Sequence, residues 1–243
     1  MRVAVTNPLV LFLSRRDDVS AEEIAALETL TLNHQDFAAG TAMIRQGDRP
    51  QSSILVLDGL AARAHYLADG KRMISALHIP GDYVDLHSLL LDRMDHDVTA
   101  LTDCRVALTA HPDIRRVTER LPHLGRLLWL STTIDAAMHR AWIVALGRMS
   151  PLSHMAHFLC EMYIRLDIVG QAADHSYRLP ITQIDLADML GLSVVHVNRT
   201  LQDLRATGMV SWVGPTVSIK DWNGLRELGQ FEDAYLNLNK RPR

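Results

Sequence analysis

Apolar positions between residues 181 and 204 follow two short helical periods with a break between them. Thr182 stands where the N-cap of the first helix is expected, Gly191 ends that helix, and Ser193 is placed to cap the second. Each helix has an apolar set at helical spacing: Leu186, Ala187 and Leu190 before the break, and Val197, Leu201 and Leu204 after it. The pattern predicts two amphipathic helices joined by a tight turn.

The second of these helices has a chemically distinctive outer face. Steps of about 100° per residue place Arg199 and Gln202 opposite the apolar set. Such a hairpin is a helix-turn-helix when its second helix enters the DNA major groove, where Arg binds guanine, Asn or Gln binds adenine, and Val contacts the thymine methyl group. An ordinary helical hairpin with a solvated polar face is the alternative. The candidate DNA-binding residues are Thr182, Ser193, Val195, His196, Asn198, Arg199 and Gln202.

Residues 209–219 predict a β-hairpin directly after the helical pair. Met209 to Trp212 and Thr216 to Ile219 alternate as strands around Gly214-Pro215. A helix-turn-helix followed by such a hairpin is a winged helix. A helix over 152–167 and a short strand at Tyr177–Leu179 precede it, and a last helix is expected from Asp221 to about Leu228.

The first half of the chain changes from helical to strand patterns. A short helical region runs to Leu30 and includes a capping box at residues 20–23. Glycines at intervals of 7 to 12 then separate short strands up to about Thr109, which predicts an antiparallel barrel or roll. The expected strands are Ala42–Ile44, Ile54–Leu57, Ala61–Tyr66 and Met73–Ile79.

A long helix is predicted from Leu121 to Met149, with a continuous seam at alternating spacings of three and four. Such a seam favours self-association, although it also fits a helix packed on its own roll. Ser150-Pro151 ends this helix and begins the next. The candidate dimer-interface residues are Leu127, Leu130, Ile134, Ala137, Ala141 and Val144.

Composition narrows the class of protein only modestly. The 243 residues are 48% apolar, enough for two domains or one large one, and the net charge of −3 shows no global basic character. Two cysteines in no motif indicate neither a disulfide framework nor an iron–sulfur cluster. Phosphate-binding glycine loops and the common nucleophile and zinc-protease motifs are absent, so we expect no enzyme. The longest N-terminal apolar run, Leu9–Leu13, is too short to span a membrane, which favours a cytoplasmic protein.

Taken together, these pieces resemble the Crp/Fnr family of bacterial transcription regulators over nearly the whole chain. The segments that resemble its cyclic-nucleotide-binding-like β-roll are Phe37–Gly40, Ile44–Asp48, Val56–Gly59, Asp69–Gly70 and Pro80–Asp82. Residues 191–202 resemble the recognition helix, with Arg199 at the family's guanine-reading position, while Val194 and Val195 replace a polar pair.

The resemblance implies an α+β chain of three parts: a sensor β-roll with N-terminal helices (1–120), a dimerisation helix (121–149) and a C-terminal winged helix-turn-helix domain (150–243). It also implies a homodimer that reads a near-palindromic operator, with half-sites about 34 Å apart or a multiple of that. DNA, a second copy of the chain and RNA polymerase are the expected partners, and a membrane is not. A sensor or scaffold protein that uses the helix-turn-helix for protein contacts is the alternative.

The chain departs from the family's cyclic-nucleotide members at the ligand pocket. Leu86 stands at the ribose-binding glutamate position and Met94 at the phosphate-binding arginine position, near Asp95 and Asp97. Two carboxylates near a phosphate would repel it, so cyclic AMP and cyclic GMP are not expected ligands unless Arg93 replaces the arginine. The candidate effector pocket comprises Asp82, Leu86, His87, Met94, Asp95 and His96.

Histidines open two metal hypotheses. His87 and His96 lie near the altered pocket and suit another effector or haem. His154, His157, Cys160 and Glu161 lie at ligand-like helical spacing, but a single helix rarely supplies a closed metal site. We therefore expect no metal and no cofactor, with a cyclic-nucleotide-, haem- or metal-responsive regulator as the alternative.

Overall fold

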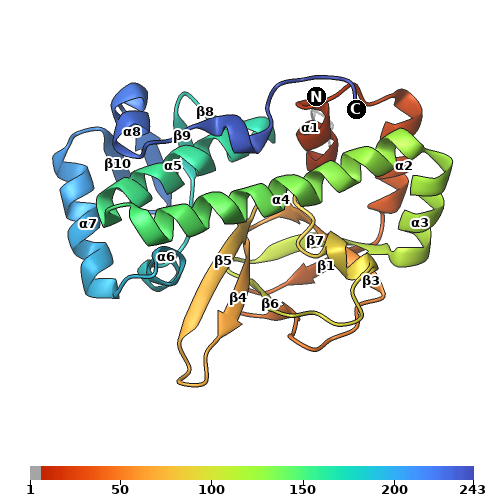
Figure 1. Ribbon diagram of the computed structural model, residues 1–243, viewed down its shortest axis with the longest axis horizontal. Coiled ribbons are helices and arrows are strands. Elements are labelled where there is room, and N and C mark those ends of the chain that lie inside the picture. Colours follow the sequence, from red (N-terminus) through yellow and green to blue (C-terminus); the bar gives the residue numbers. More distant parts are fainter. Residues whose placement is uncertain (1–6) are drawn as a thin grey trace. The chain divides into compact units, whose positions relative to one another are not determined.

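The computed structural model describes residues 7–243 and confirms the α+β class (Figure 1). The chain forms two compact units. Among the described residues, unit 1 comprises 7–64 together with 77–136 and 237–243, and unit 2 comprises 65–76 and 137–236. Among residues 7–243, no helix combines the length and the apolar character that a membrane crossing requires.

In unit 1, helices lie before and after the strands in the sequence. The predicted capping box is present, because the Ser20 side chain accepts from the Glu23 backbone while the Glu23 carboxylate accepts from the Ser20 backbone N–H. The helices are α1 (Pro8–Ser14), α2 (Ala21–Leu30), α3 (His111–Arg120) and the first part of α4 (Pro122–Arg148). They pack together through a cluster of buried residues that includes Leu9, Leu13, Leu27, Ile114, Leu124 and Leu127.

Two antiparallel sheets form the predicted roll. One has the order β1-β7-β3 and the other β2-β6-β4-β5. The strands are β1 (His34–Phe37), β2 (Ala42–Ile44), β3 (Ser52–Asp58), β4 (Ala61–Tyr66), β5 (Arg72–His78), β6 (Asp97–Ala100) and β7 (Cys104–Ala110), with a 3₁₀ turn, η1, at Leu86–Leu89. The roll's apolar interior includes Ile54, Val56, Val84, Met94, Val98 and Val106.

Unit 2 contains the predicted winged helix. Its elements are α5 (Pro151–Ile168), β8 (Ala172–Ala173), β9 (Ser176–Arg178), α6 (Gln183–Leu190), α7 (Val194–Ala206), β10 (Val210–Val213), β11 (Thr216–Ile219), α8 (Trp222–Leu228) and the 3₁₀ turn η2 (Asp233–Leu236). The strands form one sheet in the order β10-β11-β9-β8. Ser150 caps α5 and Asp221 caps α8, as their sequence positions predict.

A buried carboxylate ties three elements of unit 2 together. Glu161 on α5 is fully buried, and its oxygens accept hydrogen bonds from Trp142 Nε1 on α4 at 3.1 Å, Arg165 Nη1 at 3.1 Å and the Tyr235 hydroxyl at 2.8 Å. Tyr235 is also 3.0 Å from His157 Nε2, and His157 Nδ1 lies 3.1 Å from the Gly229 carbonyl oxygen. The network gives a buried charge the partners that it needs.

Another buried histidine on α5 makes the stability of unit 2 sensitive to acid. Burial, with a smaller contribution from the neighbouring His157, lowers the pKa of His154 from 6.5 to about 4. As the pH falls below 6.5, His154 becomes protonated in the unfolded chain. In the folded chain it stays unprotonated until about pH 4. This one group should remove about 2 kcal/mol from the free energy of unfolding between pH 7 and pH 5.

The His154→Gln variant should show a smaller fall in denaturant midpoint between these two pH values than the natural chain. His196→Gln, which alters an exposed histidine, is the control and should behave as the natural chain does. An equal fall in all three proteins would contradict the assignment to His154.

Candidate nucleic-acid interface

Caps at both ends define the helix-turn-helix. The Thr182 hydroxyl accepts from the backbone N–H of Asp185 at 3.1 Å and donates to its carboxylate at 2.6 Å, which begins α6. Gly191 ends α6 with φ of +64°, a left-handed conformation that glycine adopts without strain. Ser193 Oγ then accepts from the backbone N–H of His196 at 3.2 Å and begins α7. These local interactions fix the turn where the sequence places it.

Helix α7 has the two faces that its periodicity predicts. Val197, Leu201 and Leu204 are buried, together with Thr200. All seven candidate DNA-binding residues are exposed, and Val195 is 73% exposed at the start of the helix. The outer face of α7 is thus available to a partner and carries hydrogen-bonding, cationic and apolar side chains together.

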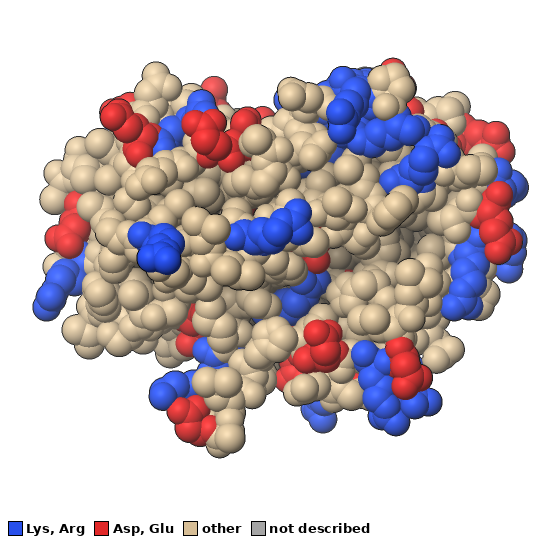
Figure 2. Space-filling model, viewed as in Figure 1, with Lys and Arg blue, Asp and Glu red and all other residues tan. Residues whose placement is uncertain are grey.

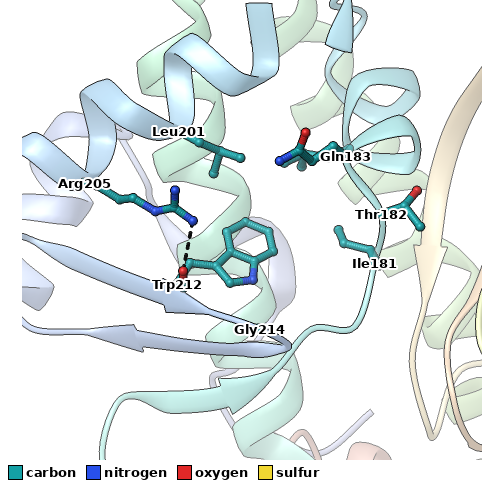
Figure 3. A pocket seen from close by; sticks show the side chains of 8 residues that line it. Ile181, Thr182, Gln183, Leu201, Arg205, Trp212 and Gly214 are labelled. Atoms are coloured by element: carbon teal, nitrogen blue, oxygen red, sulfur yellow. Dashed lines mark hydrogen bonds between the residues drawn. The ribbon is translucent and has the colours of Figure 1, made fainter. Parts of the chain in front are cut away.

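A hollow of about 200 Å³ lies between α6, α7 and the β10–β11 hairpin. Figure 3 shows the Trp212 indole between the Arg205 side chain and the residues at the start of α6. Arg205 Nη2 donates to the Trp212 carbonyl oxygen at 3.0 Å, which links α7 to β10. Exposed Thr182 and Gln183 border the hollow from α6. An arginine and the amino end of a helix both attract anions, so the chemistry of the hollow suits a phosphate group.

A single arginine of unit 2 pairs with two carboxylates of α6 and offsets part of their charge. Arg72 Nη2 donates to Asp185 Oδ1 and Arg72 Nε donates to Asp188 Oδ2, each at 2.6 Å. The two ion pairs are mostly buried. They cancel negative charge on the helix that precedes α7, which would otherwise disfavour an anionic partner. Sequence reasoning missed Arg72, because more than a hundred residues separate it from both aspartates.

Three residues of the predicted effector pocket lie in different surroundings. Met94 lies in the apolar interior of the roll, and Leu86 packs in the other cluster, against the helices. Asp82 accepts from the Ile79 backbone N–H at 3.0 Å within its turn. These three residues therefore have different packing environments.

The other three pocket residues are brought together. The ring centroids of His87 and His96 are 5.3 Å apart, and Asp95 Oδ1 is 2.8 Å from His96 Nδ1. Burial and the positive charge of Arg63 lower the pKa of His96 to about 4, against the opposing effect of Asp95. His96 is therefore uncharged at neutral pH.

Helix α4 exposes a different line of residues from the predicted seam. Leu127 and Ile134 are only 0% and 2% exposed because they pack within the chain, so they are not available to a partner. Leu130, Ala137 and Ala141 are half-buried, and Val144 is exposed. This corrects the predicted face.

The exposed line of α4 is shifted by one residue and keeps the alternation of three and four. It consists of Trp129, Thr133, Ala136, Arg140, Ile143 and Gly147. Figure 2 shows that uncharged surface predominates along α4 and that Lys or Arg side chains interrupt it. Trp129 and Ile143 are 74% and 67% exposed and supply most of the apolar area of this line.

The residues of the second metal hypothesis already have structural roles. His157 and Glu161 belong to the hydrogen-bond network that includes Tyr235. Cys160 and His154 are buried on the same helix, and burial raises the pKa of the Cys160 thiol to about 12. A thiol with that pKa is a poor source of the thiolate that binds metals.

Two family models match separate parts of the chain. Residues 34–120 match the model of the cyclic nucleotide-binding domain, and residues 153–228 match that of the Crp-like helix-turn-helix domain. The two matches cover the roll and the winged helix.

Several characterised proteins are similar to the chain over most of its length. The transcriptional activator protein FnrL of Cereibacter sphaeroides is 27% identical over 221 residues, which cover 89% of this chain and 88% of FnrL. The nitrogen fixation regulation protein FixK of Bradyrhizobium diazoefficiens is 29% identical over 185 residues, covering 76% and 77% of the two chains. The structure of FixK2 from Bradyrhizobium japonicum superposes with a TM-score of 0.73 at 23% identity, covering 81% of this chain and 96% of FixK2.

Proposed function

The chain belongs to the Crp/Fnr family of transcription regulators, and from this premise we propose that it is a homodimer that binds a near-palindromic operator through α7. The observation that carries the proposal is the exposed face of α7. It presents Arg199, Asn198 and Gln202, whose side chains suit guanine and adenine, beside the exposed Val195, which suits a thymine methyl group. We assign the protein no enzymatic activity and place its action in the cytoplasm.

The DNA backbone completes the proposed interface. Arg205, Gln183 and Thr182 border the hollow beside α7 and would bind phosphate oxygens, while the β10–β11 hairpin extends the contact (Figure 3). Backbone contacts of this kind set the register of α7 in the groove, and its side chains then determine sequence preference. RNA polymerase is the expected further partner at a promoter.

Selection of genomic DNA fragments by the purified full-length protein tests this function. Sequencing of the bound fragments should reveal an enriched palindrome whose half-sites are about one helical turn apart, or a multiple of it. The same selection from cell extract supplies any missing effector. If neither selection enriches a motif although the protein is folded, the proposal fails.

The dimer is proposed to form through the exposed line of α4. Small residues at Ala136 and Gly147 permit close approach of two helices, and Trp129 and Ile143 supply apolar area. We retain 1–120, 121–149 and 150–243 as the sensor, dimerisation and DNA-binding parts.

The Ile143→Glu variant should dissociate the dimer, because two glutamates and the loss of both isoleucines would oppose association across a symmetric contact. Sedimentation velocity should show a mass of two chains for the natural protein and one for the variant. Leu32→Glu is the matched control, since Leu32 is 73% exposed and lies between α2 and β1 in the sequence. A dimeric Ile143→Glu protein would contradict this placement of the interface.

We further propose that the effector is not a cyclic nucleotide. At the family's phosphate-binding arginine position this chain has Met94, which is 2% exposed inside an apolar cluster. A buried phosphate needs charge-assisted donors, which a thioether does not supply.

A further inference from the structure

We propose that His87, Asp95 and His96 form a binding site for a divalent transition-metal ion. One imidazole nitrogen of each histidine and one carboxylate oxygen of Asp95 lie within 4.8 Å of one another. Two imidazoles and a carboxylate suit zinc or ferrous iron, with the remaining positions open to water or a small ligand.

The geometry of the two rings fits a shared metal. Two imidazoles that bind one tetrahedral zinc, each at a distance of about 2.0–2.1 Å, place their ring centroids roughly 5 Å apart. The centroids of His87 and His96 are 5.3 Å apart, with their planes inclined at 49°. Small side-chain rotations therefore suffice to bring both nitrogens to one ion.

The surroundings prepare the histidines for this role. His96 is only 4% exposed, so the fold fixes the position of its ring, and imidazole nitrogens are the commonest metal ligands in proteins. Asp95 Oδ1 lies 2.8 Å from His96 Nδ1. The Asp95 side chain is 74% exposed, so the cluster is open to solvent on that side. An ion can enter from that side without unfolding the roll.

The positive charge of Arg63 near His96 opposes a cation, but a carboxylate offsets it. Arg63 Nη1 donates to Asp135 Oδ2 on α4 at 3.0 Å, and Arg63 Nη2 donates to the Val84 carbonyl oxygen at 3.0 Å. Arg63, Asp135 and Asp95 together therefore carry a net negative charge. The same ion pair connects the cluster to α4, because a bound cation would repel Arg63 and alter its contact with Asp135.

This connection gives the metal a role as the effector, a role that rests on the proposed regulator function. A bound metal ion would favour one position of the Arg63 side chain, relative to α4, over another. That preference would change the fraction of dimers that can bind DNA. Metal binding itself does not depend on that function.

The test uses untagged full-length protein that has been treated with a chelator and then titrated with CoCl₂. Visible absorption and equilibrium dialysis should show one Co²⁺ per chain, and Zn²⁺ should displace it. His87→Ala and His96→Ala should abolish binding, and Asp95→Asn, at an exposed position that folding tolerates, should weaken it at least about tenfold. His34→Ala removes an exposed histidine of β1 and should bind as the natural chain does.

Absent Co²⁺ binding, or equal binding by the natural chain, His87→Ala and Asp95→Asn, would overturn the metal site. Operator affinity is then measured with and without Zn²⁺, and with cyclic AMP as the comparison ligand. A change with Zn²⁺ alone supports the effector role, and stoichiometric binding without any change in operator affinity refutes it. If Co²⁺ binds but no DNA is bound under any condition, the regulator function fails while the metal site stands.

Discussion

The Glu161→Ala variant is expected to lose about 3–5 kcal/mol of the free energy of unfolding, because removal of one member of a buried ion pair leaves the other charge uncompensated. Arg165 is 6% exposed and would lose the carboxylate that lies 3.1 Å from its guanidinium. Trp142 and Tyr235 would lose the acceptor that each uses. Urea denaturation followed by far-UV circular dichroism measures the change, because this signal does not depend on Trp142 itself.

A matched variant separates the charge from the hydrogen bonds. Trp142→Phe keeps the buried ion pair and removes one neutral donor, so we expect a loss of only about 1–3 kcal/mol. If Glu161→Ala were no less stable than Trp142→Phe, Glu161 would not be the centre of this network.

The Arg199→Ala variant should retain its fold and lose most of its operator affinity. A bidentate arginine–guanine pair contributes about 1–3 kcal/mol to discrimination. A homodimer loses one pair at each half-site, so the total is expected to be about 2–6 kcal/mol. Fluorescence anisotropy with the selected operator measures it, and the unfolding midpoint should stay unchanged because Arg199 is exposed.

Arg120→Ala is the control for net charge. It removes one exposed arginine of α3, so it should reduce operator affinity only slightly through the general attraction to phosphate. Equal losses in the two variants would mean that Arg199 acts only as a positive charge and does not read a base.

Local signals in the sequence were sufficient for the winged helix. Thr182, Gly191 and Ser193 act through neighbours within a few residues, and the apolar period of α7 depends only on its own helix. The glycine-punctuated strands of the roll were recognisable for the same reason. Strand β1 was not predicted, because His34–Phe37 is largely exposed and polar and has no alternation. The short strand β6, the strand β7 and helix α3 were missed as well.

The parts that failed depend on long-range packing. The helical period of α4 was correct, but which of its faces is covered depends on the α1 and α2 residues that pack around Leu127. The exposed line mixes Trp129 and Ile143 with Thr133 and Arg140, so hydrophobicity alone did not reveal it. The placement of Leu86 and Met94 in different apolar clusters likewise depends on tertiary packing.

The most direct measurement of base reading by α7 is a double-mutant cycle between Arg199 and the guanine that its family position implies. Operators in which this guanine is replaced in both half-sites should bind the natural protein about 2–6 kcal/mol more weakly. The same replacement should cost the Arg199→Ala protein almost nothing, because the pair is already lost. If the replacement weakened both proteins equally at every guanine of the half-site, Arg199 would not read the operator and the proposed recognition by α7 would be contradicted.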